Sequence, residues 1–275
     1  MINAYLTAAR PKTLIASISP VSIGAAYAYK EGCFEPILFS SILLFALCIQ
    51  IGTNFANDYY DFLKGGDTLL RKGPIRPLQL GIISLSRMKQ GFFTFFSLAF
   101  LFSLFPIYQT KSYLILIPML SILLGILYTR GPKSLAYIGL AEPFVFFFFG
   151  PIASFGTYYA QTHQFSLIPI LLGIGTGLIS IAILAANNLR DFEEDSLTNK
   201  KTPVVRFGKT FGKVEYLLSL TLAYLIPILF LQPLIFLLTF PYSLCYHVLK
   251  KNDLSPLLPK TATILWIYTL LCLFS

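Results

Sequence analysis

Long apolar runs separated by short polar loops dominate this chain. A helix needs ~20 predominantly apolar residues to cross a bilayer, so runs of this length predict membrane-spanning helices. Pro and Gly occur inside several runs, which membrane helices tolerate. We expect nine spans, at residues 13–29, 36–56, 88–108, 112–129, 138–160, 166–187, 214–231, 233–249 and 261–275.

The composition supports a single membrane-embedded domain. Of the 275 residues, 56% are hydrophobic and only 12% are charged, whereas a soluble domain carries about 25% charged residues. The predicted loops are too short to form a separate soluble domain. We therefore predict an all-α membrane protein, with nine transmembrane helices in one bundle, one domain over residues 1–275, and the lipid bilayer as its surroundings.

The positive charges are divided unequally between the two membrane faces. If the residues before the first span lie on one side, that side receives 19 of the 21 Lys and Arg residues, and the other side receives Lys30 and Lys111. An excess of Lys and Arg marks cytoplasmic loops. We expect the N-terminus and the loops after spans 2, 4, 6 and 8 to be cytoplasmic. This sorting accounts for the net charge of +9, and we expect no nucleic-acid partner.

Amides and carboxylates gather where spans 2 and 6 reach the cytoplasmic face. In "NFANDYYDFLKGGD" the polar offsets of 0, 3, 4 and 7 share one helix face. This first stripe consists of Asn54, Asn57, Asp58 and Asp61. In "NNLRDFEED" the spacing i, i+4, i+8 forms a second stripe, which consists of Asn187, Asp191 and Asp195. One such stripe is typical of a solvated helix end, but two on the same face indicate a shared ligand.

The chemistry of the two stripes favours Mg²⁺ carrying a phosphorylated ligand. Carboxylate and amide oxygens suit Mg²⁺, which binds through few carboxylates and completes its shell with substrate phosphates. Two facing carboxylate clusters repel each other unless cations lie between them. The candidate metal ligands are therefore the amide and carboxylate oxygens of the two stripes.

Cationic loops follow the stripes and suit the charge of a diphosphate. They contain Lys64, Arg71, Lys72, Arg76, Arg130, Lys133, Lys200, Lys201, Arg206 and Lys209. Topology alone explains most of these residues, because cytoplasmic loops are rich in Lys and Arg. Arg76 and Lys201 are the strongest candidates for phosphate, since each follows an Asp stripe in a short loop. Glu142 is an ionisable group within a span and thus a functional candidate, although Pro143 equally suits a structural kink.

Four segments resemble the UbiA superfamily of intramembrane aromatic prenyltransferases. They are "NDYYDFLKGGD", "GPIRPLQLGIIS", "LYTRGPKSLAYIGLAEPFVFFFFGPIASFGTYY" and "NNLRDFEEDSLTNKKTPVVRFG", to which "RPKTL" at 10–14 adds. The branch that they resemble most is that of the 1,4-dihydroxy-2-naphthoate polyprenyltransferases of menaquinone synthesis. The resemblance runs from about residue 10 to 212. In one departure from the general pattern, Asp67 follows Asp61 by six residues rather than four, which leaves its role open.

The resemblance implies a bundle with a central cavity capped by cytoplasmic loops, in a bacterial cell membrane. It implies that Mg²⁺, held through Asn57, Asp61, Asp191 and Asp195, binds a polyprenyl diphosphate. The prenyl group would pass to an aromatic naphthoate acceptor, with loss of CO₂ and diphosphate, giving demethylmenaquinone. The expected catalytic residues are Asp58, Asp61, Asp191, Asp195 and Lys133. The expected substrate-binding residues are Arg10, Asn54, Lys64, Asp67, Arg76, Tyr128, Glu142, Asn188, Lys201 and Arg206.

Other functions stay open at this point. Within the superfamily, acceptors of the 4-hydroxybenzoate, 1,4-dihydroxy-6-naphthoate, haem or chlorophyll type fit the same motifs. An ion-coupled transporter would place its acids near mid-span, whereas nearly all of them lie at one face here. A phosphotransferase acting on lipid alcohols would carry an Asp-Gly-x-x-Ala-Arg core, which this sequence lacks. A binding or scaffold protein without enzymatic activity is another alternative, and it would release no pyrophosphate from a prenyl diphosphate.

We predict that loops 57–87, 130–137 and 188–213 face the cytoplasm, because of the unequal division of Lys and Arg. A cysteine placed at position 66 or 199 in a Cys-free background should resist an impermeant thiol reagent added outside intact cells. The same cysteine should react once the cells are permeabilised. Labelling in intact cells would overturn this orientation.

Overall fold

The regular structure in the described part of the chain is entirely helical. The computed structural model describes residues 2–65, 76–110, 115–131, 134–198, 200–228, 245–246, 249, 254 and 256–274. This confirms the all-α fold over these residues. The helices are α1 (Ile2–Ala9), η1 (Pro11–Thr13), α2 (Ile15–Lys30), α3 (Pro36–Leu63), α4 (Leu85–Thr110), α5 (Leu116–Leu127), α6 (Leu135–Ile138), α7 (Ala141–Phe148), α8 (Pro151–Thr162), α9 (Leu167–Arg190), α10 (Phe192–Leu197), α11 (Pro203–Ile228) and α13 (Leu257–Phe274).

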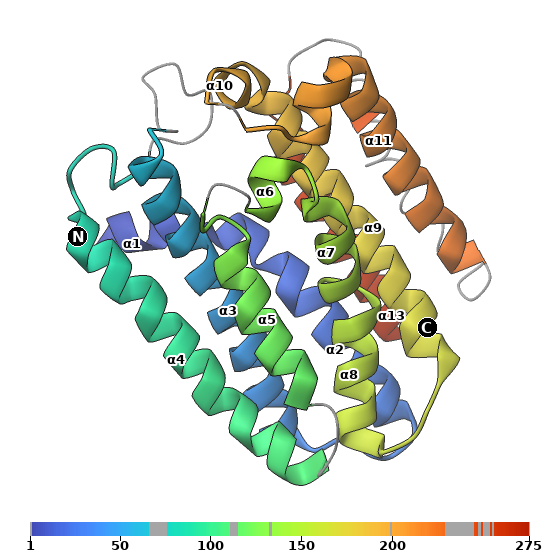
Figure 1. The fold of residues 1–275 in the computed structure, drawn as a ribbon. Coiled ribbons are helices and arrows are strands. Elements are labelled where there is room, and N and C mark those ends of the chain that lie inside the picture. Colours follow the sequence, from blue (N-terminus) through green and yellow to red (C-terminus); the bar gives the residue numbers. More distant parts are fainter. Residues whose placement is uncertain are drawn as a thin grey trace.

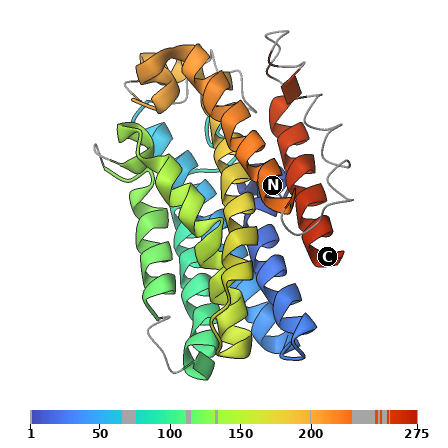
Figure 2. The ribbon, with the colours of Figure 1, turned by 90° about the vertical axis from the view of Figure 1, so that its right-hand side faces the viewer.

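The long helices run side by side, and the short helices α6 and α10 lie at one end of the bundle (Figures 1 and 2). Neighbours in the bundle include α3 with α4, α2 with α8, and α9 with α11. Helix α13 packs against both α2 and α9, so the last described helix closes onto the first part of the chain. We call the end that carries α6 and α10 the loop end.

Four helices are long and apolar enough to cross a membrane by length and composition. They are α3, α4, α9 and α13, and α5 is a shorter apolar helix. Helix α3 continues past residue 56 to Leu63, so the first polar stripe lies on the spanning helix itself. The expected span 138–160 is divided into α7 and α8. Most of the expected span 233–249 lies outside the described residues, and the count of nine spans stays a prediction.

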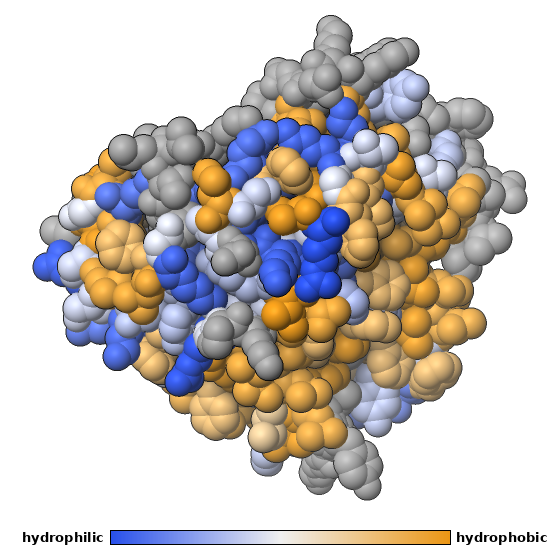
Figure 3. All heavy atoms as spheres, turned by 45° about the horizontal axis from the view of Figure 1, so that its top comes forward, coloured by the Kyte–Doolittle hydropathy of each residue, from blue (hydrophilic) through white to orange (hydrophobic). Residues whose placement is uncertain are grey.

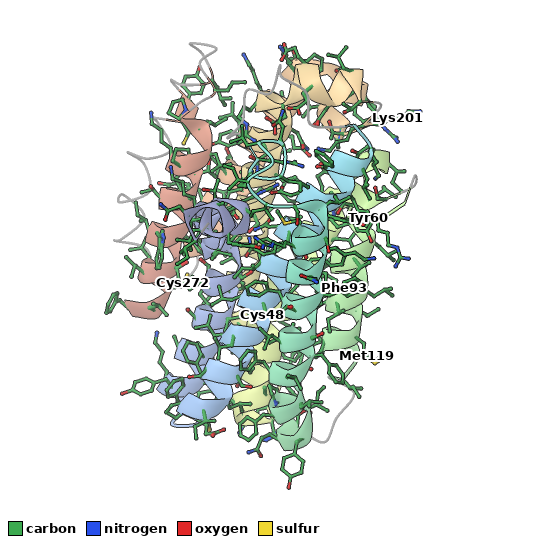
Figure 4. The ribbon with its side chains drawn as sticks, turned by 90° about the vertical axis from the view of Figure 1, so that its left-hand side faces the viewer. Cys48, Tyr60, Phe93, Met119, Lys201 and Cys272 are labelled. Carbon is green, nitrogen blue, oxygen red and sulfur yellow. The ribbon has the colours of Figure 1, made fainter. Side chains whose placement is uncertain are left out.

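The outer surface of the bundle is apolar, as expected of an integral membrane protein. Phe93 and Phe100 of α4 and Met119 of α5 are exposed, and Met119 points away from the bundle in Figure 4. Contiguous exposed apolar surface of this kind needs an apolar partner, which lipid supplies. At the loop end, hydrophilic side chains gather over the middle of the surface, with hydrophobic ones along its flank (Figure 3).

The junction between α7 and α8 packs directly on the backbone of α9. Pro151 begins α8, a position where the missing N–H of proline is tolerated. A Cβ atom on Gly150 would lie 2.4 Å from the Phe146 carbonyl oxygen and 2.8 Å from that of Gly173. Small residues permit such close approach of membrane helices. The contact brings α7 beside α9, the helix that carries part of the second polar stripe.

We predict that Gly150→Ala lowers the melting temperature of the detergent-solubilised protein by several degrees. Overpacking costs about 1–3 kcal/mol, and the atoms that the new methyl would meet belong to backbone. Gly156→Ala is the matched control on α8, since the nearest atom to its new Cβ would be the Ile117 Cδ1 at an ordinary 3.4 Å. Equal melting temperatures for the two variants would contradict the close contact.

Candidate active site

Two arginines neutralise the buried carboxylates of the first stripe. The Arg10 guanidinium donates to the Asp58 Oδ1 at 2.6 Å. Arg76 lies 3.2 Å from the same oxygen through its Nε and donates to the Asp61 Oδ2 at 2.9 Å. Asp58 is 1% exposed and Asp61 is 6% exposed. Buried carboxylates need such partners, so three segments of the chain meet at the last two turns of α3.

Helix α6 adds a hydroxyl group to this cluster. The Tyr137 hydroxyl donates to the Asp61 Oδ1 at 3.1 Å, and the Lys64 ammonium lies 3.6 Å from the centre of the Tyr137 ring. Lys64 also donates to the Thr129 carbonyl oxygen at 2.7 Å. Burial and the Asp61 charge raise the pKa of Tyr137 well above its usual value, so Tyr137 remains a hydrogen-bond donor. Burial lowers the pKa of Lys64.

The two asparagines of the first stripe face the interior of the bundle. The Asn57 Oδ1 accepts a hydrogen bond from the Thr129 hydroxyl at 2.7 Å. The Asn54 amide donates to the Ala9 carbonyl oxygen at 2.9 Å. Both residues line the central cavity. The sequence thus predicted the common face correctly, and the structure adds the tertiary partners.

The second stripe carries its own cations. The Arg190 guanidinium donates to both oxygens of Asp191, at 2.7 Å each, and the Lys200 ammonium lies 3.1 Å from the Asp195 Oδ1. The Asp195 Oδ2 is buried without a hydrogen-bond partner among the described residues. Burial raises the pKa of Asp195, Lys200 opposes this shift, and the charges of Asp191 and Asp61 add to it. The two stripes lie close to each other, since Asn57 of the first and Asn187 of the second line the same cavity.

The remaining polar groups of α9 connect the stripe to its surroundings. The buried Asn188 donates to the Glu142 Oε1 of α7 at 3.3 Å, which ties two predicted substrate-binding residues to each other. Asn187 lines the cavity. Glu142 therefore lies beside the second stripe rather than alone within a span.

Lys201 and Arg206 hold the loop after α10 against α6. The Lys201 backbone N–H donates to the Tyr137 carbonyl oxygen at 2.9 Å. The Arg206 guanidinium donates to the carbonyl oxygens of Ile138, at 2.7 Å, and Lys201, at 3.1 Å. Gly139, with φ of +67°, permits this approach, because a Cβ there would lie 2.5 Å from the Lys201 oxygen. The Lys201 side chain itself is exposed at the loop end (Figure 4).

Sequence reasoning placed Lys200 among the loop cations but favoured Lys201 for phosphate, and it did not single out Tyr137. Lys200 and Lys201 are adjacent residues of one type, and only the path of the backbone decides which ammonium reaches Asp195. Tyr137 lies outside both stripes, in a short helix whose sequence gives no sign of its contact with Asp61. Asp67 and Lys133, which the sequence analysis assigned to the site, lie outside the described part of the chain.

A largely apolar cavity of about 290 Å³ extends from the polar cluster into the bundle. Its walls come from α2, α3, α4, α5, α7, α8 and α9. Along α3 it extends from Asn57 to Ile42, a separation of fifteen positions or about 22 Å at 1.5 Å per residue. The polar residues at its upper end are Arg10, Asn54, Asn57, Tyr128 and Asn187.

The oxygen ligands of the two stripes fit a Mg²⁺ ion. Among the described residues, no three Asp, Glu, His or Cys side chains converge on one point. Mg²⁺ does not require such a cage, since it binds through one or two carboxylates and takes phosphate oxygens and water for the rest. The buried, unpartnered Asp195 Oδ2 is a suitable ligand. The chemistry of the donor set therefore matches the metal that the sequence predicts.

Comparisons with known proteins agree with this arrangement. The 1,4-dihydroxy-2-naphthoate octaprenyltransferase of Haemophilus influenzae is 39% identical over 78% of this chain and 72% of its own length. The enzyme of the same name from Escherichia coli is 37% identical over 75% of this chain and 69% of its own length. The 2-carboxy-1,4-naphthoquinone phytyltransferase of Synechocystis is 30% identical over 81% of this chain and 72% of its own length.

Solved structures share the fold at low sequence identity. A UbiA homolog from Archaeoglobus fulgidus bound to GPP and Mg²⁺ matches with a TM-score of 0.64 at 18% identity, over 99% of this chain and 100% of the other. A digeranylgeranylglyceryl phosphate synthase matches with a TM-score of 0.59, also at 18% identity, over 99% and 96% of the two chains. The UbiA prenyltransferase family itself matches residues 17–251. Most of the chain is covered by that match, and the protein belongs to the UbiA prenyltransferase family.

Proposed function

We propose that this protein transfers a polyprenyl group from an allylic polyprenyl diphosphate to 1,4-dihydroxy-2-naphthoate. The observation that carries the proposal is the joining of a charged oxygen-ligand cluster to a deep apolar cavity. The cluster suits a diphosphate and the cavity suits a hydrocarbon chain. The relatives named for this reaction, which are 37–39% identical over three quarters of the chain, support the choice of acceptor.

The reaction balances without a protein nucleophile. The bond between the prenyl C1 and the diphosphate oxygen breaks, and its electron pair leaves with the diphosphate. A ring carbon of the acceptor then forms the new bond to C1. The carboxylate leaves as CO₂, and the electron pair of its C–C bond returns to the ring. The products are diphosphate, CO₂ and demethylmenaquinone in its reduced form.

Oxygens from both stripes would hold the diphosphate-bound metal. We assign this role to Asn57, Asp61, Asp191 and Asp195, with Asn187 beside them. Bound Mg²⁺ would neutralise the charge that develops on the leaving diphosphate. The A. fulgidus homolog, described as bound to GPP and Mg²⁺, supports the use of Mg²⁺ and a prenyl diphosphate. Asp58, fixed by Arg10 at 2.6 Å, would position the end of α3 and be part of the catalytic cluster.

Arg76 would change partners when substrate binds. Its guanidinium lies against the Asp58 and Asp61 carboxylates. A metal ion ligated by Asp61 would need the Asp61 oxygen that Arg76 now contacts. Once displaced, a guanidinium is well suited to bind phosphate oxygens in pairs. Metal and diphosphate would therefore promote each other's binding through Arg76, as linked ligands do.

The cavity walls would protect the reactive allyl cation. Phe144, Phe148 and Phe149 line the cavity, whereas Phe147 is 48% exposed on the outer surface. A dry pocket prevents water from trapping the cation, and aromatic faces stabilise positive charge. Only part of the phenylalanine run thus lines the cavity, while Phe147 lies on the outer surface.

The direct test uses purified protein with Mg²⁺, a labelled polyprenyl diphosphate and a panel of aromatic acids. We expect a product whose mass equals the prenylated acceptor minus CO₂, with 1,4-dihydroxy-2-naphthoate turned over in preference to 4-hydroxybenzoate and 1,4-dihydroxy-6-naphthoate. Preferred turnover of another acid would correct the acceptor. No released pyrophosphate with any acceptor would refute the enzymatic proposal.

We predict different effects of Lys200→Gln and Lys201→Gln, because only the Lys200 ammonium lies at the second stripe. Losing one charge-assisted hydrogen bond to diphosphate is worth roughly 1.5–3 kcal/mol, or about 10- to 100-fold. Lys200→Gln should lower kcat/KM for the prenyl diphosphate at least tenfold. Lys201→Gln is the matched control and should stay within about twofold of the parent. Equal losses in the two variants would place the diphosphate elsewhere.

A further inference from the structure

Gln50 is a buried amide that lines the cavity below the carboxylate cluster. It lies on α3 and is 8% exposed. Seven residues separate it from Asn57, so it lies about 10 Å further into the bundle along the helix axis. A long polar side chain is costly to bury unless its groups are hydrogen-bonded. Its place in a largely apolar wall therefore calls for polar partners.

Two contacts, one with the end of η1 and one with the start of α2, fix the orientation of this amide. The Gln50 Nε2 donates to the Thr13 carbonyl oxygen at 2.7 Å, and the Gln50 Oε1 accepts from the Ser17 hydroxyl. A glutamine amide has two N–H donors and two acceptor lone pairs. The two contacts use one of each. Gln50 thus retains one donor and one lone pair beyond these contacts, on a side chain that lines the cavity.

The hydroxyl groups elsewhere on the cavity wall are used differently. Ser121, Thr157 and Ser180 each donate to the carbonyl oxygen four residues earlier in their own helix. This is a common way to satisfy hydroxyls in membrane helices. Gln50 instead bridges two helices and keeps hydrogen-bonding capacity for a ligand. That capacity does not match a prenyl chain, which is hydrocarbon, but it matches a phenolic ring.

We propose that Gln50, positioned by Ser17, binds a ring hydroxyl of the aromatic acceptor and so helps select a dihydroxylated ring. This inference rests on the proposed function, because it takes the cavity as the place where acceptor and prenyl chain meet. The reacting carbon of the acceptor must lie near the diphosphate, under Asn57. Both hydroxyls of 1,4-dihydroxy-2-naphthoate are on the ring that carries the reacting carbon, and the one turned away from the diphosphate then points towards Gln50.

Binding constants for three acids test the contact without relying on turnover. The acids are 1,4-dihydroxy-2-naphthoate, 1-hydroxy-2-naphthoate and 4-hydroxy-2-naphthoate, titrated against the purified parent and Gln50→Leu. Losing a neutral hydrogen bond should weaken binding of the dihydroxy acid roughly tenfold. Of the two monohydroxy acids, one lacks the hydroxyl that Gln50 binds. That acid should have the same dissociation constant for the parent and for Gln50→Leu. Such a cycle isolates the pairwise contact.

Two further variants serve as controls for this experiment. Ser121 lines the same cavity, and its hydroxyl is hydrogen-bonded within its own helix. Ser121→Ala should therefore change none of the three dissociation constants by more than about twofold. Ser17→Ala removes the hydroxyl that orients Gln50 and should reproduce the Gln50→Leu pattern more weakly. Ser17→Ala therefore serves as the test if Gln50→Leu does not fold.

The outcomes separate this inference from the proposed function. Equal weakening of all three acids in Gln50→Leu would show that Gln50 only shapes the cavity and would overturn the contact. Unchanged constants for all three acids would overturn it too. A parent protein that binds the dihydroxy acid through Gln50 but does not prenylate it would refute the proposed function and leave the contact standing.

Discussion

The pairing of Arg10 and Arg76 with Asp58 and Asp61 is the interaction on which the loop end of this protein depends. It joins the residue before η1, the segment before α4 and the last turns of α3. Arg10 adopts a left-handed backbone conformation, with φ of 53°, which is strained for a residue other than glycine. Removing one partner of a buried ion pair leaves an uncompensated charge, which typically costs 3–5 kcal/mol. The pairs thus stabilise a strained turn and neutralise two buried carboxylates at the loop end.

The same constraint links the charged cluster to the cavity beneath it. Helix α3 carries the carboxylates at its end, Asn57 and Asn54 at the cavity mouth, and Gln50 deeper in the wall. One continuous helix therefore sets the spacing between the proposed diphosphate site and the proposed acceptor site. The broken helix α7–α8 closes the opposite wall, since Gly150 brings it onto α9 and places Glu142 beside Asn188.

The sequence alone predicted the features that follow from local periodicity. The first polar stripe was found, because residues four apart share a helix face whatever surrounds them. The second was predicted on one helix, but the helix is interrupted at Asp191, so that Asn187 lies on α9 and Asp195 on α10. The family resemblance is confirmed. Features set by tertiary contacts were not found. Nothing in "NKKT" distinguishes Lys200 from Lys201, and nothing in "LAYIG" shows that Tyr137 reaches Asp61. The break at Gly150 was missed because the run 138–160 is long enough and apolar enough to be interpreted as a single span. The roles of the individual site residues stay predictions.

The central claim is that Asp61 exchanges Arg76 for a metal ion when diphosphate arrives. The most direct test is the dissociation constant of Mn²⁺, as a spectroscopic substitute for Mg²⁺, with and without inorganic diphosphate, in the parent and in Arg76→Gln. The account predicts that diphosphate tightens Mn²⁺ binding to the parent within the usual coupling range of about 5- to 150-fold. Arg76→Gln should bind Mn²⁺ alone more tightly than the parent does and should lose most of the coupling. A variant that binds Mn²⁺ alone no better than the parent, with the coupling intact, would contradict the account.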